Sequence, residues 1–355
     1  LYNRKCSVQK NVFNLALYIS LFPQLIAGPI VRYSTVENEI ENRTENSQDV
    51  TNGFVRFVFG LGKKCLLANY MAVIADVVFN GFDAGIIPSA LDAWLGAIAY
   101  SLQIYFDFSG YSDMAIGLGL IFGFHFNENF NYPYMARSIT DFWRRWHISL
   151  SSWFRDYVYI PLGGNRKGMP RQFFNMFVVW ALTGIWHGAA FTFWVWGILY
   201  FVLLSVEKFF SLDKIGKKVP AFFYRLFTLF CVMCAWIIFR SPSLGFAFNY
   251  WTYLFGASPV KAGGNIFEIF ANNYYLQNGG ILLLASVIAC FPIFPLLKSK
   301  YSALLDNLQQ KKAKSCKMLS ILTQIAVCLW FAFVFVFSVL SCIKSTYNPF
   351  IYFNF

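Results

Sequence analysis

The residues best suited to chemistry lie in one polar segment of an otherwise apolar chain. Residues 141–168 read DFWRRWHISLSSWFRDYVYIPLGGNRKG, in which arginines, aspartates and a histidine alternate with tryptophans. A second histidine, His187, follows in the apolar run ALTGIWHGAAFTF. Ionisable side chains at membrane depth are costly, and those found there usually face a water-filled cavity or a substrate path. We therefore take the segment from Asp141 to His187 as the candidate functional region.

A single helix over residues 141–157 would carry a charged face. On such a helix an aspartate lies next to two arginines, so its carboxylate can neutralise one guanidinium and orient both. Arginine forks suit phosphate groups, so this face could bind a cytoplasmic cofactor that carries several phosphates. The same pattern fits an interfacial helix whose Arg and Trp side chains anchor it to lipid headgroups. The residues of the face are Asp141, Trp143, Arg144, Arg145, His147 and Ser151.

The middle of the next apolar run, residues 173–196, holds one ionisable group, His187. Small residues on both sides leave space beside its ring, and a neutral imidazole there could act as a general base for acyl transfer to an alcohol. It could also simply hydrogen-bond a neighbouring helix. No acidic residue lies nearby in the sequence, and neither His125 nor His147 stands at metal-ligand spacing from it, so no metal site is expected.

Composition sets the fold class. Hydrophobic residues make up 57% of the chain, aromatic residues 21% and charged residues 13%, and the mean hydropathy is positive. Apolar runs of about 20 residues, without the short alternating pattern of a barrel, predict an all-α polytopic membrane protein. The formal net charge of +12 does not indicate nucleic acid, because the Lys and Arg residues lie in short interhelical segments. The eight cysteines are expected to be small buried hydrophobes without a disulfide framework.

Two charged pairs interrupt the apolar pattern. Lys63 and Lys64 come too early for a simple span, which fits an interfacial helix or a snorkelling pair. In the long apolar run over residues 93–124, Asp107 and Asp113 are six residues apart, about 240° around a helix, so only one of them is expected to face a cavity. The glycines in this run indicate close helix packing.

The whole chain, residues 1–355, is expected to form one membrane-embedded domain. Its opening at Leu1, without a methionine or a signal-peptide pattern, suggests that further helices precede it. Basic segments place the loops around them in the cytoplasm, so the last three apolar runs cross outward, inward and outward, at residues 222–240, 279–297 and 318–342. The aromatic tail, residues 343–355, is then extracytoplasmic.

Four motifs resemble the membrane-bound O-acyltransferase (MBOAT) family, in particular its bacterial branch that O-acetylates envelope polysaccharides and exopolysaccharides. The resemblance covers about residues 10 to 210 closely and the remainder only in its hydrophobic outline. The motifs are LFPQLIAGPIVRY at 21–33, YFDFSGYSDMAIGLG at 105–119, the block from Asp141 to Arg166, and LTGIWHGAAFTFWVWG at 182–197.

The resemblance implies a helical ring around a tunnel that opens to both membrane faces. By the same resemblance His187 looks like the catalytic histidine at the narrow centre, with Trp186 beside it on the donor side, and His147 looks like the second polar residue across the tunnel. The D-alanylation branch is similar, but PLGGNR at residues 161–166 is closer to the O-acetylation branch. Acetyl is therefore the expected group and D-alanyl the alternative.

The expected reaction takes acetyl from a cytoplasmic thioester, acetyl-CoA, through the membrane of a bacterial cell to an envelope polysaccharide. No cofactor is expected to stay bound, and the expected partner is a separate extracytoplasmic acetyltransferase of the SGNH-hydrolase type. Tyr352, in the tail NPFIYFNF, resembles a tyrosine proposed to relay acyl groups, although it could equally be an interfacial aromatic anchor. A transporter, with the central charges as its permeation path, and a scaffold for the secreted enzyme are the alternatives from other classes.

Overall fold

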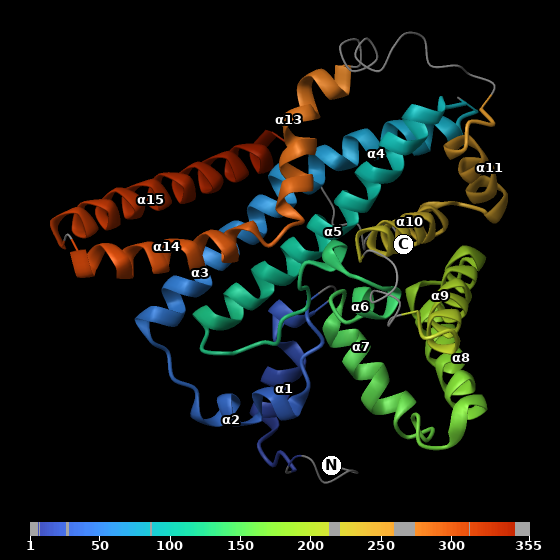
Figure 1. Ribbon diagram of the computed structural model, residues 1–355. Helices are drawn as coiled ribbons and strands as arrows, with labels where there is room; N and C mark the ends of the chain where they lie inside the picture. Colours follow the sequence, from blue (N-terminus) through green and yellow to red (C-terminus); the bar gives the residue numbers. More distant parts are fainter. Residues whose placement is uncertain are drawn as a thin grey trace.

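Helices build all the regular structure in the described part of the chain, as Figure 1 shows. This computed structural model describes residues 6, 8–25, 28–85, 87–212, 221–258, 274–311 and 313–344. Within those ranges four helices are long and apolar enough to cross a membrane: Ser47–Asp83, Phe191–Phe209, Phe222–Arg240 and Cys316–Lys344. The prediction of an all-α, multi-pass membrane protein is confirmed. The C-terminal relay candidate Tyr352 and most of the predicted tail lie outside the described residues.

The frame of the molecule is a pair of long helices packed along each other. One is a continuous rod made of α3 (Ser47–Gly62), the π-helical turn η2 (Lys63–Ala68) and α4 (Asn69–Asp83); the other is α5 (Ala90–Ile121). Glycines allow their backbones to meet, because a Cβ on Gly60 would lie 2.6 Å from the carbonyl oxygen of Gly110. The close packing expected of the α5 glycines is confirmed.

Lys63 and Lys64 sit inside this rod, so the prediction of an interfacial helix or a snorkelling pair is wrong. The Lys64 Nζ lies 2.5 Å from Oδ1 of Asp107, with both side chains almost fully buried. The Lys63 Nζ lies 2.6 Å from Oδ2 of Asp113, which also binds Arg56. Long lysine stems from adjacent positions reach both Asp107 and Asp113, so both carboxylates point toward the rod and neither is left to a cavity.

The predicted helix over residues 141–157 is broken. It consists of α6 (Ile139–Trp143), α7 (Ile148–Phe154) and a π-helical turn η4 (Arg155–Tyr159). His147 interrupts it with a left-handed backbone, φ 45°. The loop before it supplies the missing bonds, since Asn131 N donates to Arg145 O at 2.9 Å and Ile148 N donates to Asn129 O at 3.0 Å.

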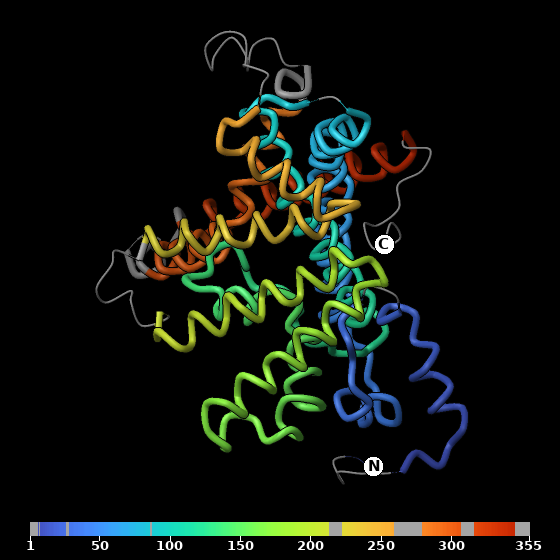
Figure 2. The backbone as a smooth tube through the Cα atoms, turned by 90° about the vertical axis from the view of Figure 1, so that its right-hand side faces the viewer, coloured from blue at the N-terminus to red at the C-terminus, as the bar shows by residue number. Residues whose placement is uncertain are grey.

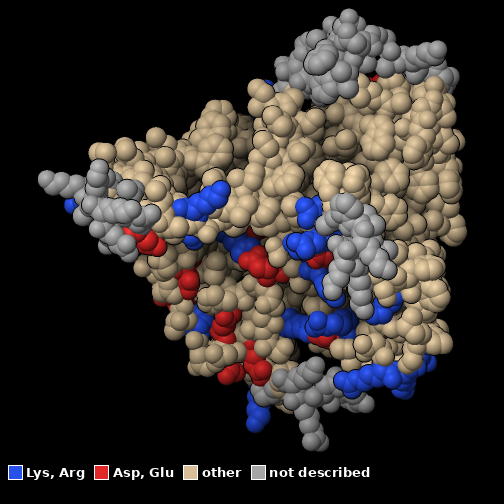
Figure 3. Space-filling view, in the orientation of Figure 1, with Lys and Arg blue, Asp and Glu red and all other residues tan. Residues whose placement is uncertain are grey.

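The helices α8 (Gly168–His187) and α9 (Phe191–Phe209) form a tight hairpin beside α6 and α7. Gly188 ends α8 directly after His187. Its φ of 148° is a backbone conformation that favours glycine. In Figure 2 this hairpin leads into α10 (Ala221–Arg240), which packs on α9. Figure 3 shows charged side chains gathered in the half of this face that holds α1, α2 and α7, while the other half is nearly uncharged.

The remaining helices surround this core. The segment predicted to return over residues 279–297 is bent by 65° between α13 and α14. The prediction that the cysteines are buried is confirmed for Cys65 and Cys290 and is wrong for Cys328 and Cys342, which are exposed on the outward-facing α15. The other four are half-buried. The bounds of the remaining elements are α1 Val12–Ser20, η1 Phe22–Gln24, α2 Tyr33–Asn42, η3 Pro133–Met135, α11 Leu244–Leu254, α13 Tyr274–Ala289, α14 Ile293–Lys311 and α15 Ala313–Lys344.

A buried carboxylate on α9 fixes the start of α6. Both oxygens of Glu207 accept backbone bonds, from Ile139 N at 2.7 Å and from Thr140 N at 2.9 Å. The hydroxyl of Tyr224 on α10 donates to the same carboxylate at 3.1 Å. These are the first amides of α6, which have no partner inside the helix, and an anion there is also favoured by the helix dipole.

The buried Lys64–Asp107 pair can be tested with a double-mutant cycle. Lys64→Met leaves the Asp107 carboxylate buried without its lysine, which should lower the stability by roughly 3–5 kcal/mol. Lys64→Met with Asp107→Leu buries no charge and should recover much of that loss. Thermal unfolding in detergent measures all four proteins. Strictly additive losses would show that the pair does not stabilise the rod.

Glu207→Leu should destabilise the protein, because it leaves two backbone donors of α6 without acceptors, at about 1–3 kcal/mol for each buried donor. Glu207→Gln keeps one oxygen acceptor and should lose less, and Tyr224→Phe removes only one of the three bonds. Unfolding temperatures and protease protection of residues 137–147 measure the effect. A Glu207→Leu protein as stable as the wild type would contradict this role.

Candidate functional site

A cavity of about 340 Å³ lies between the α6–α7 segment and the α8–α9 hairpin. Along α8 it follows one face from Gln172 to Thr183, and the next residue on that face, one turn further, is His187. Its charged lining residues are three cations, Arg144, Arg155 and Lys208. The rest is mainly apolar and aromatic. The cavity therefore contains a cationic region and, on α8, ends at Thr183, one helical turn before His187.

The ring of His187 is enclosed by aromatic side chains. Its centroid lies 4.9 Å from that of Trp186, 5.0 Å from Trp196 and 5.1 Å from Phe239. The imidazole is half-buried, whereas half of the surface of Trp186 is exposed. These rings exclude most of the water around His187 and supply no charge, which keeps the imidazole neutral and able to accept a proton.

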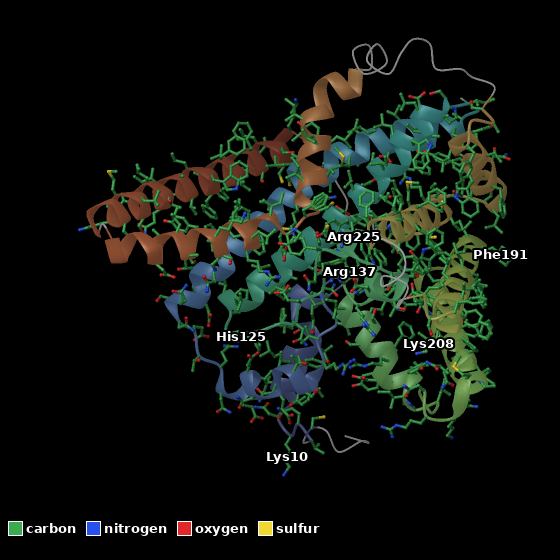
Figure 4. All side chains as sticks on the ribbon, in the orientation of Figure 1. Lys10, His125, Arg137, Phe191, Lys208 and Arg225 are labelled. Atoms are coloured by element: carbon green, nitrogen blue, oxygen red, sulfur yellow. The ribbon has the colours of Figure 1, made fainter. Side chains whose placement is uncertain are left out.

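His147 also lies near Trp186. Its ring centroid is 6.1 Å from that of Trp186 and 4.7 Å from Phe108 on α5, and the side chain is only 3% exposed. The structure thus brings together His147, Trp186 and His187, three residues that the sequence singled out from two separate segments. The third histidine, His125, lies far from them beside α2, where it contacts Glu39 (Figure 4).

The residues predicted for the donor side separate into two groups. Trp143, Arg144 and Ser151 line the cavity. Asp141 and Arg145 do not line the cavity. They form an ion pair in which Oδ1 of Asp141 lies 2.9 Å from Nε of Arg145. The prediction that the aspartate would neutralise one arginine is confirmed, and it leaves Arg144 as the guanidinium available to the cavity.

The charge around Arg155 at the cavity edge is set by one aspartate shared between two arginines. Asp156 lies 2.8 Å from Nε of Arg155 and 2.6 Å from Nη1 of Arg32. Hydrogen bonds and charge from Arg155, and then from Arg32, lower the pKa of Asp156 to about 2, so it is ionised at neutral pH. Asp156 contributes one negative charge, whereas Arg32, Arg155 and Lys208, which lies at the end of α9 (Figure 4), contribute positive ones. The region is therefore positive and suited to an anion.

Two residues of the site were missed by sequence reasoning. Asn129 is fully buried and bonds the turn that carries His147. Its only signal is its place in an Asn-rich loop. Glu207 has a clearer signal in the sequence, because it is a single carboxylate in the last turn of an apolar helix.

No group of three His, Cys, Asp or Glu residues in the described ranges is placed to hold a metal ion.

Comparison with known proteins gives consistent matches. A "Probable alginate O-acetylase AlgI" of Pseudomonas putida is 45% identical over 68% of this chain and 49% of its own length. The peptidoglycan O-acetyltransferase of Helicobacter pylori is 35% identical over 96% of this chain and 64% of its own. The teichoic acid D-alanyltransferase of Bacillus subtilis is 31% identical over 59% and 54%.

The chain spans about half the length of several of these curated relatives. The model of the membrane-bound O-acyltransferase family matches residues 7–212, more than half of the chain. That stretch contains α6 to α8, both histidines of the site and the whole cationic edge of the cavity. The chain therefore belongs to the membrane-bound O-acyltransferase (MBOAT) family.

Proposed function

We propose that this protein is an O-acetyltransferase that moves acetyl from a cytoplasmic thioester, acetyl-CoA, across the membrane for O-acetylation of an envelope polysaccharide. The observation that carries the proposal is the cavity, which is lined by Arg144, Arg155 and Lys208 and ends on α8 at Thr183, one helical turn before His187. The names of the relatives, O-acetylases and O-acyltransferases of envelope polymers, support the same reaction class.

In the proposed reaction each group has one task. The arginines and Lys208 bind the phosphates of the donor, which are anionic, while its thioester arm enters the apolar part of the cavity. His187 takes the proton of the accepting hydroxyl as its oxygen attacks the thioester carbonyl, and the proton is then given to the departing thiolate. The products are an O-acetyl ester and the free thiol, so the proton balance closes.

Acetyl is favoured over D-alanyl by the lining of the cavity. No Asp or Glu is among its lining residues in the described ranges, so the ammonium of a D-alanyl group would meet no carboxylate there. The relatives named for O-acetylation also match more closely than the D-alanyltransferase does.

Two alternatives from other classes make different demands on the protein. A transporter would need no thioester, and a scaffold for the secreted enzyme would need neither His147 nor His187.

We also propose that Tyr352, in the C-terminal tail, receives the acetyl group on the outer face and that a separate SGNH-type acetyltransferase places it on the polysaccharide. This arrangement puts the protein in the bacterial cytoplasmic membrane with its C-terminal tail outside. The tail resembles short aromatic tails proposed for acyl relay, and a phenol would need His187 as its base.

His187→Ala should abolish acetylation, because no other described side chain at this turn can take a proton from the hydroxyl. The assay is mass spectrometry of envelope sugars in a deletion strain that carries each variant. His125→Ala is the matched control, since this exposed histidine lies away from the cavity, and it should acetylate normally. Normal acetylation by a well-expressed His187→Ala protein would reject the proposed catalytic role.

Arg144→Met with Arg155→Met should raise the KM for acetyl-CoA about tenfold or more, because each arginine supplies charge-assisted bonds to phosphate, and should change kcat less. Membrane vesicles that expose the cytoplasmic face give both constants. Arg137→Met is the control, an exposed arginine that does not line the cavity. If Arg137→Met raised the KM as much as the Arg144→Met, Arg155→Met double variant does, the proposed donor site would be rejected.

A further inference from the structure

The amide of Asn129 holds the turn that carries His147. Asn129 lies in the loop after α5 and is fully buried. Its Oδ1 is 3.2 Å from Ser149 N, 2.9 Å from Ser149 Oγ and 3.1 Å from His147 Nδ1. Its Nδ2 donates to Ser112 Oγ on α5 at 3.0 Å. Four polar groups from two segments, the turn of His147 and Ser149 and helix α5, therefore meet at this side chain.

The backbone fixes which end of the amide is the oxygen. Ser149 N is an amide that can only donate, so the Asn129 atom facing it must be the acceptor Oδ1. The same oxygen faces Nδ1 of His147, and an acceptor next to a ring nitrogen requires a hydrogen on that nitrogen. The hydroxyl of Ser149 lies 2.9 Å from Asn129 Oδ1 and 3.5 Å from His147 Nδ1, so its hydrogen goes to the nearer acceptor, Asn129. Neutral His147 therefore carries its proton on Nδ1, and its lone pair is on Nε2.

This tautomer limits what His147 can do. In the described ranges Nε2 of His147 has no hydrogen-bond partner. The His147 side chain is nevertheless only 3% exposed, and its ring lies beside that of Trp186. A bare Nε2 accepts a hydrogen bond and cannot donate one to a developing oxyanion. The site then holds two imidazoles, those of His147 and His187, whose ring centroids lie 6.1 Å and 4.9 Å from that of Trp186.

We propose that Asn129 is a positioning residue that holds His147 as the Nδ1–H tautomer, so that Nε2 accepts a hydrogen bond from the N–H or O–H group that a substrate brings to the site. The role in turnover rests on the proposed function, whereas the tautomer does not. The charged groups around His147 leave this assignment intact. His187 faces it from α8, while the carboxylates of α5 bind lysines of the rod and Asp141 binds Arg145.

The tautomer can be read directly by nitrogen-15 NMR of the full chain with labelled histidine, with His147→Gln used to assign the signal. The wild type should show His147 protonated on Nδ1 alone. Asn129→Leu, of similar size and without an acceptor, should give a mixture or the Nε2–H form. Asn129→Asp should keep the Nδ1–H form, because its carboxylate accepts from the ring and from Ser149, and Ser112 can turn to donate.

Kinetics then test the positioning role. Asn129→Leu should lower kcat about tenfold or more with little change in the KM for acetyl-CoA, and Asn129→Asp should restore much of it. The carboxylate favours the imidazolium, so the acidic limb of the Asn129→Asp rate profile should move up by about one pH unit or more. Asn127→Leu is the matched control, an exposed asparagine two residues earlier in the same loop, and it should change neither readout.

The outcomes separate this inference from the proposed function. An Nε2–H signal in the wild type, or an unchanged Nδ1–H signal in Asn129→Leu, overturns the positioning role even if acetylation is lost. Equal loss in Asn129→Leu and Asn129→Asp, with no shift of the acidic limb, also overturns it. Normal acetylation by His187→Ala would instead overturn the proposed function and leave the tautomer standing.

Discussion

The structure depends on one constraint: in a chain surrounded by lipid, every polar group must find its partner within the protein. A helix meets this constraint by itself, so each departure from a helix needs another segment to complete its bonds. The break between α6 and α7 is such a departure. Asn131 and Asn129 complete it with backbone and side-chain bonds, and the left-handed residue at the break is His147. The constraint thus fixes the side chain of His147, a candidate functional residue.

Helix α5 connects the frame to the site. Its Asp107 and Asp113 bind the lysines of the rod, whereas Phe108 packs against His147. Ser112, one turn further along, accepts the bond from Asn129. A shift of α5 against the rod would therefore move both contacts of the His147 turn. On the opposite side Glu207 ties α6 to α9, so the cavity walls are held through buried charge as well as through packing.

The sequence indicated the membrane helices and the glycine contacts of α5, because apolar length and small residues are local signals. It also selected His147 and His187 by residue type. It did not indicate the break after Trp143, since the 3.6-residue period continues through it and the competing bonds come from residues 129–131. The partners of Lys63 and Lys64 were missed for the same reason: they lie about 40 to 50 positions away, on another helix.

The placement of charge along the cavity bears on how a donor could enter in the proposed reaction. Gln172 and Thr183 on α8 are separated by three turns, roughly 16 Å at about 1.5 Å per residue. The cations Arg144, Arg155 and Lys208 line this cavity, whereas the rings around His187 carry no charge. Moving a phosphate into the aromatic end would cost its hydration without a cation to replace it. A donor held by its phosphates can therefore reach His187 only through a thin, uncharged arm, which lets the acyl group proceed while its carrier stays behind.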